Sequence, residues 1–517
     1  MKTPRVITIS FLFVLLILSG SCKNRAPVSS SLPRSTPEAE GVASAELITF
    51  LDSVAAGRHE FHSIMIIRHG KVVAEGWWAP YSRELRHTMY STSKSFTSTA
   101  VGFAVTEKLL SVDDTVISFF PDQLPDTVSP FLARMTVKDL LTMSAGQVPD
   151  PTGRISTSSG DWVKEFLATP VLKEPGTEFL YNSMATFMLS AIVQKVTGEK
   201  IADYLRPRLF EPLGIEGYDW EESPGGITSG GWGLRVKTED MAKFGLLYLQ
   251  KGMWNGKQII PAAWIEEATT FKIDQAPGEL PEEKAMSDWK QGYCYQFWRC
   301  RNNAYRADGA FGQYIIVMPE KDAVVAITCE SPDLQDEINL VWDHILPAMK
   351  EGPLQEDKET LTVLKERFAN LALPVPVEKP DSPLASAISG KSFKIISDHG
   401  SQGYFNFRFS SDTCHLSLEM NGEEASIAFG RGRWIESETG FPGPSLLSRP
   451  LGFTSHRIAA AYEWKDDSTL VLTARYIESP HSIMFNFTFE ADTLIMNMRL
   501  SPPPGRDTPQ VKAVMEE

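Results

Sequence analysis

The sequence predicts a mixed α/β domain followed by an all-β domain, and two patterns along the 517 residues carry this prediction. Between about residues 42 and 349, strand-like apolar runs at both ends enclose segments with helical spacing. This order is typical of one α/β unit whose sheet joins its N- and C-terminal parts. From about residue 389 the apolar residues alternate strictly and helical periodicity is essentially absent. The length alone also favours two folded units.

Composition narrows the class of protein. Hydrophobic residues make up 42% of the chain and charged residues 22%, as in globular proteins with a large core. The net charge of −15 argues against a nucleic-acid partner, because neutralising phosphates requires a basic surface. No CxxC pair or Cys/His ligand cluster occurs, so we expect neither a metal nor another cofactor.

The N-terminus is predicted to be a targeting segment. A basic start at residues 1–5 precedes the apolar run ITISFLFVLLILSG, which is too short for a membrane span. Residues 1–21 resemble a bacterial lipoprotein signal, with Cys22 as the lipidated first mature residue. Such a protein would be exported and anchored on the periplasmic side of a membrane or at the cell surface. The alternative is a plain secretory peptide with an incidental cysteine, because Ser19 stands where leucine is usual.

The Ser/Pro-rich residues 22–40 are expected to be a tether, and residues 41–350 form the predicted α/β domain. A hairpin is expected at 63–74, around Gly70. Helical spacing occurs around 95–110, 136–143, 184–197 and 238–250, and strand-like runs follow at 292–299, 313–318 and 322–329.

Residues 351–386 are charged and Pro-rich and are expected to be a linker, with a possible helix at 358–371. Residues 387–517 are the predicted all-β domain, a small barrel or a sandwich. Its histidines are scattered, which favours surface or core positions over a metal site: His399, His415, His456 and His481.

Four cysteines follow Cys22, namely Cys294, Cys300, Cys329 and Cys414. If YCYQFWRC is a strand, Cys294 and Cys300 lie about 20 Å apart, which is too far for a disulfide. The sequence does not choose among the other pairings.

The strongest candidate for chemistry is Ser91-Thr92-Ser93-Lys94. A serine hydroxyl is a weak nucleophile that needs an adjacent base, and residues i and i+3 share one face of a helix. Ser91 opens a small and apolar run with helical spacing, which predicts a buried helix that begins in a cleft. A second copy, Ser287 to Lys290, follows a charged, Pro-containing stretch typical of a solvated loop. The alternative for Ser91 is an ordinary helix cap with a surface lysine.

Two further segments suit this chemistry. Lys94 must be neutral to act as a base, which requires burial or polar neighbours. Tyr181 follows a Pro-Gly turn and precedes a predicted helix, where a tyrosine can relay protons. Small residues between 307 and 312 allow a strand backbone to approach a substrate and to bind an oxyanion.

Together these motifs resemble the serine β-lactamase-related and penicillin-binding-protein-like hydrolases, in the class C-like branch with esterases, D-aminopeptidases and amide-dimer hydrolases. The resemblance covers roughly residues 40–350 and implies a serine β-lactamase-like domain with an antiparallel sheet. Supporting segments lie at 109–114, 136–146, 230–234, 238–241 and 309–313.

The resemblance implies a serine hydrolase that cleaves an ester or amide. Ser91 would form an acyl-enzyme, and Lys94 and Tyr181 would share the proton transfers. The backbone N–H groups of Ser91 and Ala310 would hold the oxyanion. Substrate contacts are expected at Ser183, Asp308, Gly309 and Gln313.

Two departures argue against an efficient β-lactamase. The family usually has Tyr-x-Asn, whereas Ser183 stands at the third position here and Asn182 in the middle. The usual Lys-Thr-Gly or His-x-Gly is replaced by Ala307-Asp308-Gly309, which lacks the cation that anchors a substrate carboxylate. Strand alternation places Arg306 on the same face as Asp308.

Other interpretations stay open. The site could belong to a sensor or scaffold that binds or acylates without efficient turnover, or the β-domain could be the functional part as a lipid or glycan binder. No Gly-x-Ser-x-Gly elbow is present. His87 could touch the site, although a structural role is expected. Four tryptophans could line an acyl pocket or pack in the core: Trp77, Trp78, Trp232 and Trp298.

Overall fold

The computed structural model describes residues 31–376, 379, 381–396, 403–420, 423–441, 443–444, 454–501 and 510–516. The predicted signal peptide, Cys22 and His399 lie outside the described residues. Within the described ranges, no helix combines the length and the apolar character that crossing a membrane requires.

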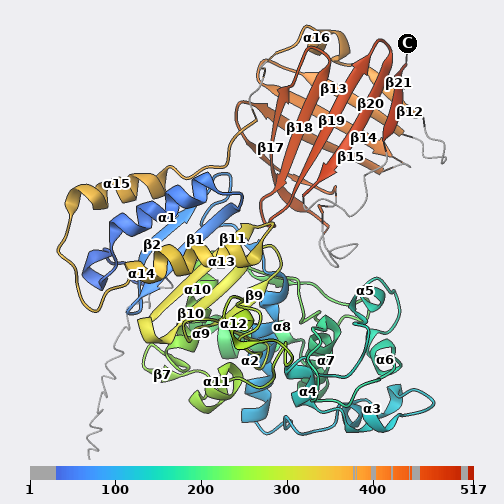
Figure 1. Cartoon of the computed structure of the whole chain (residues 1–517). Helices are drawn as coiled ribbons and strands as arrows, with labels where there is room; N and C mark the ends of the chain where they lie inside the picture. The colour runs from blue at the N-terminus through green and yellow to red at the C-terminus, as the bar shows by residue number, and fades with distance from the viewer. Residues whose placement is uncertain are drawn as a thin grey trace, which may run out of the picture.

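The first domain is built on a six-stranded antiparallel sheet (Figure 1). Its strands are, in spatial order, β2 (Lys71–Trp77), β1 (Glu60–Arg68), β11 (Ala323–Glu330), β10 (Gln313–Met318), β9 (Tyr305–Gly309) and β8 (Trp298–Arg299). Ile64 of β1 pairs with Ile327 of β11, so the sheet joins the two ends of the domain as predicted. The predicted hairpin is β1 and β2.

Helices cover both faces of this sheet, which explains why its central strands are buried on both sides. Ile64 and Ile66 belong to the core beneath α1 (Ser44–Ala56), whereas Met65 and Ile67 belong to the core that includes α10 (Thr238–Leu249). The larger core extends to α2 (Ser93–Thr106) and α7 (Ser183–Thr197), which pack on each other.

The helices predicted around 95, 136, 184 and 238 are confirmed as α2, α4, α7 and α10. Besides α4 (Val137–Leu141), this domain also contains the helices α3 (Pro130–Arg134), α5 (Thr152–Ile155), α6 (Trp162–Leu167), α8 (Ile201–Leu205), α9 (Glu211–Leu213), α11 (Ala262–Thr269), α12 (Pro281–Lys284), α13 (Leu334–Leu340) and α14 (Leu346–Ala348). Short strands form two small ribbons: β3 (His87–Thr88), β4 (Asp219–Trp220) and β5 (Leu234–Val236) in one, and β6 (Met253–Trp254) and β7 (Lys257–Gln258) in the other.

The C-terminal domain is a nine-stranded β-barrel, so of the two predicted forms the structure has the barrel. Its strands are β12 (Ser392–Ile396), β13 (Gly403–Phe409), β14 (Thr413–Met420), β15 (Glu423–Arg431), β17 (His456–Trp464), β18 (Thr469–Tyr476), β19 (Ser482–Glu490), β20 (Thr493–Leu500) and β21 (Val511–Met515). A parallel pairing of β15 with β17 closes the barrel, and β16 (Ile435–Thr439) pairs with β17 outside this ring. The alternating phenylalanines Phe405 and Phe407 point into the barrel core.

Two expectations, for the tether and for the strand at 292–299, need correction. The predicted tether is packed from Leu32 onward, because this leucine is buried and Arg34 forms ion pairs with Glu75 and Glu239. The helix expected within the linker is confirmed as α15 (Lys358–Ala369), which packs on α1 and β2 because Leu361 and Leu364 are buried. The predicted strand at 292–299 is reduced to β8, because residues 294–297 form a tight turn in which the Cys294 N–H donates to the Phe297 carbonyl.

The four cysteines after Cys22 are buried free thiols. Burial raises the pKa of the Cys294 and Cys300 thiols to about 12 and about 11, so both are protonated and unreactive.

Candidate active site

Ser91 lies in a short 3₁₀ turn, η2 (Tyr90–Thr92), that leads directly into α2. The Ser91 side chain makes no capping hydrogen bond and is partly exposed, whereas Lys94 is only 2% exposed. The Lys94 Nζ atom lies 3.0 Å from Ser91 Oγ. The alternative of a helix cap beside a surface lysine is therefore wrong.

Three oxygens surround the Lys94 amine. Its Nζ lies 2.6 Å from the Gly231 carbonyl, 3.0 Å from Ser183 Oγ and 3.0 Å from Ser91 Oγ. A neutral amine has two N–H donors and one lone pair. When the carbonyl and Ser183 accept the two N–H bonds, the lone pair is directed at the Ser91 hydroxyl. The arrangement satisfies the base form of Lys94.

Burial lowers the pKa of Lys94 from 10.5 to about 7, against the opposing effect of the Asp150 and Asp308 carboxylates. No carboxylate among the described residues contacts the amine directly. A substantial fraction of Lys94 is therefore neutral at neutral pH, as a general base requires.

Tyr181 completes the group. Its ring centre lies 4.9 Å from Lys94 Nζ, and its hydroxyl interacts with the Ser91 side chain. Burial raises the pKa of Tyr181 well above its usual value, and the interaction with Ser91 offsets only part of this rise. The phenol therefore keeps its proton at neutral pH. Lys94 is suited to accept a proton and Tyr181 to donate one.

The structure explains why Asn182 and Ser183 stand where the family usually has x-Asn after the tyrosine. The Asn182 side chain caps α7 by accepting the N–H groups of Met184 and Ala185, and it donates to Gln147. Ser183, one residue later, turns toward Lys94. Ser183 was predicted to touch substrate, and the structure places its hydroxyl on the amine of the base.

The β9 strand lies against the nucleophile segment because residue 309 is glycine. A Cβ atom at Gly309 would lie 2.3 Å from the Met89 carbonyl and 3.0 Å from Thr92 Oγ1. Ala310 follows in the partly exposed β9–β10 turn. The close approach brings the predicted oxyanion-hole residues, Ser91 and Ala310, to the same end of the strand.

The prediction for Gln313 is wrong. Its side chain is fully buried, and its amide nitrogen donates to the carbonyls of Ala310 and Cys329. The Cys329 N–H in turn donates to the Gln313 side-chain oxygen. The side chain therefore fixes the β9–β10 turn and does not face a substrate.

Asp308 and Arg306 share one face of β9, as strand alternation predicts. The Arg306 guanidinium donates to Asp308 at 2.8 Å, is fully buried, and lies over the Trp289 ring at 4.3 Å. It also donates to the Asp288 carbonyl and the Cys300 sulfur. Arg306 is thus held inside the protein and does not offer a free cation to a substrate.

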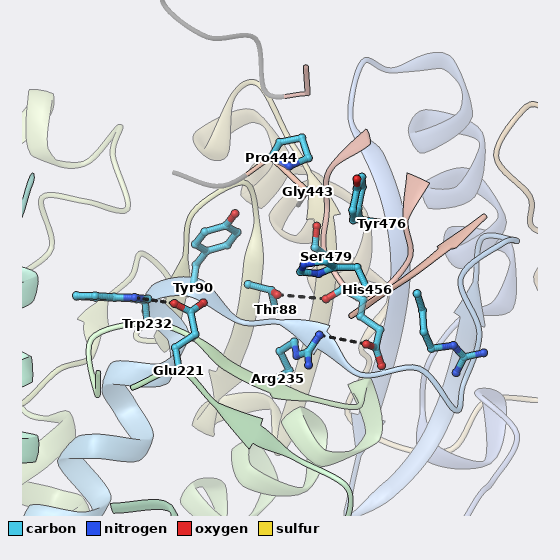
Figure 2. Close-up of a pocket in the computed structure, with 13 residues that line it drawn as sticks. Thr88, Tyr90, Glu221, Trp232, Arg235, Gly443, Pro444, His456, Tyr476 and Ser479 are labelled. Carbon is cyan, nitrogen blue, oxygen red and sulfur yellow. Dashed lines mark hydrogen bonds and ion pairs between the residues drawn. The ribbon is translucent and has the colours of Figure 1, made fainter. Parts of the chain in front are cut away.

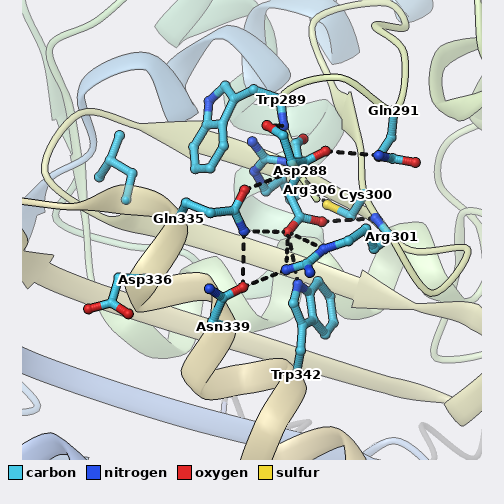
Figure 3. A network of polar contacts seen from close by, with 12 residues as sticks. Asp288, Trp289, Gln291, Cys300, Arg301, Arg306, Gln335, Asp336, Asn339 and Trp342 are labelled. Atoms are coloured by element: carbon cyan, nitrogen blue, oxygen red, sulfur yellow. Dashed lines mark hydrogen bonds and ion pairs between the residues drawn. The ribbon is translucent and has the colours of Figure 1, made fainter. Parts of the chain in front are cut away.

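Asp288 organises the network behind Arg306 (Figure 3). Its carboxylate accepts hydrogen bonds from Arg301, Gln335 and Trp342 at 2.8–3.0 Å. Asp288 belongs to the second Ser-x-x-Lys copy, whose Lys290 pairs with Glu279. That copy therefore serves a structural role.

Several site residues were missed or left open by sequence reasoning. The Gly231 carbonyl lies in a glycine run that was noted only as a supporting segment. Trp298 stacks on Tyr181 at 5.7 Å and lines the site. Trp78 instead belongs to the core beneath α1, and Trp77 packs against the core that includes α10. Trp232 follows Gly231 and packs on Trp162.

Gln296 also escaped prediction. It has a positive φ of 63°, its carbonyl accepts from Ser95 of α2, and its side chain bonds Thr186 of α7 and the end of α4. Nothing in the sequence around it signals this bridging role. His87, by contrast, has the expected structural role, because it is buried and bonded to His62 and the Thr88 carbonyl.

Comparison with known proteins identifies the family of the first domain. The family model described as Beta-lactamase matches residues 52–347. The chain belongs to this family. The 6-aminohexanoate-dimer hydrolase of Paenarthrobacter ureafaciens is 25% identical over 292 residues, which cover 52% of this chain and 73% of that protein. The Beta-lactamase of Escherichia coli K12 is 22% identical over 185 residues, or 32% of this chain and 48% of that protein.

Among solved structures, "Putative 6-aminohexanoate-dimer hydrolase from Bacillus anthracis" superposes with a TM-score of 0.51 at 19% identity. It covers 62% of this chain and 89% of that structure, and at this identity it supports the fold alone. The residues matched by the Beta-lactamase family model include Ser91, Lys94 and Tyr181.

Proposed function

We propose that this member of the Beta-lactamase family is a serine hydrolase that cleaves an ester or amide bond through an acyl-enzyme on Ser91. The observation that carries the proposal is the buried Lys94 amine, whose lone pair is directed at the Ser91 hydroxyl when Gly231 and Ser183 accept its N–H bonds.

In the proposed reaction, Lys94 removes the Ser91 proton while Oγ attacks the substrate carbonyl. The backbone N–H groups of Ser91 and Ala310 stabilise the oxyanion. Tyr181 then donates its proton to the leaving alcohol or amine and recovers a proton from the Lys94 ammonium. Water, activated by the same pair, releases the acid and frees Ser91. Protons and bonds balance without a cofactor.

We propose further that β-lactams are poor substrates. A β-lactam carries a carboxylate, whereas the position where the family places a cation holds Ala307 and the next position holds Asp308. The nearby guanidinium of Arg306 is already bonded to Asp308 and buried. Uncharged esters and amides avoid this repulsion, and a relative named as an amide-dimer hydrolase is consistent with that class.

The test is a fluorophosphonate probe combined with assays of p-nitrophenyl esters, D-amino-acid amides and nitrocefin. We expect one adduct on Ser91, turnover of an ester or amide, and little nitrocefin hydrolysis. Labelling that persists in Ser91→Ala would overturn the mechanism. Stoichiometric acylation without turnover would favour the sensor or scaffold alternative, and nitrocefin turnover typical of a resistance enzyme would overturn the substrate class.

We also propose that the protein is exported and anchored by a lipid on Cys22. The basis is the order of a basic start, an apolar run and a cysteine at residues 1–22. Metabolic labelling with an alkyne fatty acid should modify the wild-type protein and not Cys22→Ser, and the variant should leave the membrane fraction. An unlabelled wild-type protein would favour a plain secretory peptide.

A further inference from the structure

The barrel contacts the segment that leads into Ser91. The turn between β18 and β19 brings the Glu478 carbonyl to Thr88, whose backbone N–H and hydroxyl donate to it at 2.9 and 3.2 Å. The Glu478 carboxylate accepts from Arg86 and Arg235 at 3.1 Å. Figure 2 shows Thr88 and Arg235 beside Ser479 and His456 of the barrel. The approach to the nucleophile is therefore part of the domain interface.

His481, at the end of this turn, is fully buried between the domains. Its Nδ1 lies 2.8 Å from the Glu330 carboxylate and its Nε2 lies 2.5 Å from the Tyr90 hydroxyl. A carboxylate only accepts, so Nδ1 donates to Glu330, while Nε2 is hydrogen-bonded with the Tyr90 hydroxyl. The Ser501 hydroxyl donates to the other Glu330 oxygen. The ring of His481 is thus oriented from both ends.

The same ring also packs against Phe311. The His481 and Phe311 centres lie 4.9 Å apart with an interplanar angle of 85°, and the Tyr90 and Phe311 rings lie 5.5 Å apart. Tyr90 directly precedes Ser91, and Phe311 directly follows Ala310. His481 therefore contacts the chain neighbours of both proposed oxyanion-hole residues.

Both neighbours have a strained backbone. Tyr90 has a φ of 46° and Phe311 a φ of 65°, in the left-handed region that residues with a side chain rarely adopt. Such conformations persist only where the surroundings hold them. Here the surroundings include a residue from the other domain.

We propose that His481 is a positioning residue that holds the two halves of the oxyanion hole in register. The inference rests on the proposed function of Ser91 and assigns a catalytic consequence to the barrel. Oxyanion donors must lie about 3 Å from the developing charge, and a shift of about 1 Å can cost roughly a hundredfold in rate. Loss of the His481 contacts should therefore slow acylation while leaving substrate binding intact.

Two matched substitutions test the proposal. Tyr90→Phe removes the hydroxyl that bonds His481 and keeps the ring. Tyr81→Phe removes a hydroxyl that donates to the Ser479 carbonyl at 3.0 Å, in the same barrel turn but away from Ser91. Both variants lose one hydrogen bond between the domains. His481→Ala removes both ends of the contact.

The measurements are kcat and KM for a p-nitrophenyl ester, the rate of Ser91 labelling by a fluorophosphonate, and the thermal midpoint. We expect Tyr90→Phe to lower kcat and the labelling rate about tenfold, with KM within about twofold. His481→Ala should lose more, and Tyr81→Phe should retain the wild-type rates.

Wild-type rates in Tyr90→Phe would overturn the positioning role, even if His481→Ala fails to fold. Equal losses in Tyr90→Phe and Tyr81→Phe would also overturn it, because they would indicate a general effect of the interface. An unreactive Ser91 in the wild-type protein would instead overturn the proposed function itself.

Discussion

The Ser183 hydroxyl lies 3.0 Å from the Lys94 amine, in the position that follows the α7 cap residue. The short Ser183 side chain accepts one N–H bond of the amine, while Asn182 caps the N-terminus of α7. The Tyr181-Asn182-Ser183 motif thus divides two roles between adjacent residues. Asn182 caps α7, and Ser183 is the polar partner of Lys94.

Replacing Ser183 should therefore impair the base. In Ser183→Ala, one N–H bond of a buried amine is left without its acceptor, which costs about 1–2 kcal/mol, or roughly tenfold in kcat/KM. The matched control is Ser287→Ala, in the structural Ser-x-x-Lys copy, which should behave as the wild-type protein. Ester hydrolysis at saturating and limiting substrate measures both. Full activity in Ser183→Ala would show that Gly231 alone orients the amine.

The pH profile should report Lys94. Because burial lowers its pKa to about 7, the neutral base form accumulates as pH rises through that value. The kcat/KM for an uncharged ester should rise about tenfold per pH unit below 7 and level off above it. Tyr181 stays protonated over this range because burial raises its pKa. A flat profile between pH 5 and 8 would contradict Lys94 as the base, and Lys290→Met serves as the control that keeps the wild-type profile.

We expect the Asp308 carboxylate to disfavour the hydrolysis of anionic substrates. Asp308→Asn removes a negative charge beside the site and leaves the Arg306 charge uncompensated, so we expect the preference for an anionic over a neutral ester to rise about tenfold. The buried guanidinium loses its partner, which should lower the free energy of unfolding by about 3 kcal/mol. Asp150→Asn, at an exposed carboxylate near the amine, should change both quantities far less. Paired ester assays and denaturant unfolding test this, and an unchanged preference would refute it.

Gly309 should tolerate no side chain. In Gly309→Ala, the added Cβ would meet the Met89 carbonyl at 2.3 Å, so β9 must move away from the nucleophile segment. We expect kcat to fall at least a hundredfold, because the oxyanion donors separate. Gly278→Ala, where an added Cβ meets nothing within 4 Å, should keep wild-type kcat. Near-normal activity in Gly309→Ala would mean that the strand is not fixed there.

Much of this architecture could be predicted because it depends on local patterns. Periodicity identified α2, α7 and α10 and the β1–β2 hairpin, and strict alternation identified the barrel strands. Ser91, Lys94 and Tyr181 carry motif signals at the start of helices, and the structure brings them together.

The remaining features depend on contacts between distant segments. The burial of the Arg306–Asp308 pair, the bridging role of Gln296 and the burial of Gln313 follow from tertiary packing that no short sequence pattern encodes. The strand expected at 292–299 is mostly absent for the same reason. Gln296 and the turn around it form hydrogen bonds with α2, α7 and α4 instead of pairing with a neighbouring strand. His481 is separated from Tyr90 by 391 residues, so no local sequence pattern could place the two side by side.

The pairing of β1 with β11 has a consequence for the order in which the protein folds during synthesis. Roughly 250 residues separate these partners, so the central strand pair closes only after nearly the whole first domain has left the ribosome. The barrel turn that carries His481 emerges later still. A nascent chain that already contains Ser91 and Lys94 therefore lacks both the sheet behind them and the support beside them. Ser91 is synthesised early, and the contacts that surround it form last.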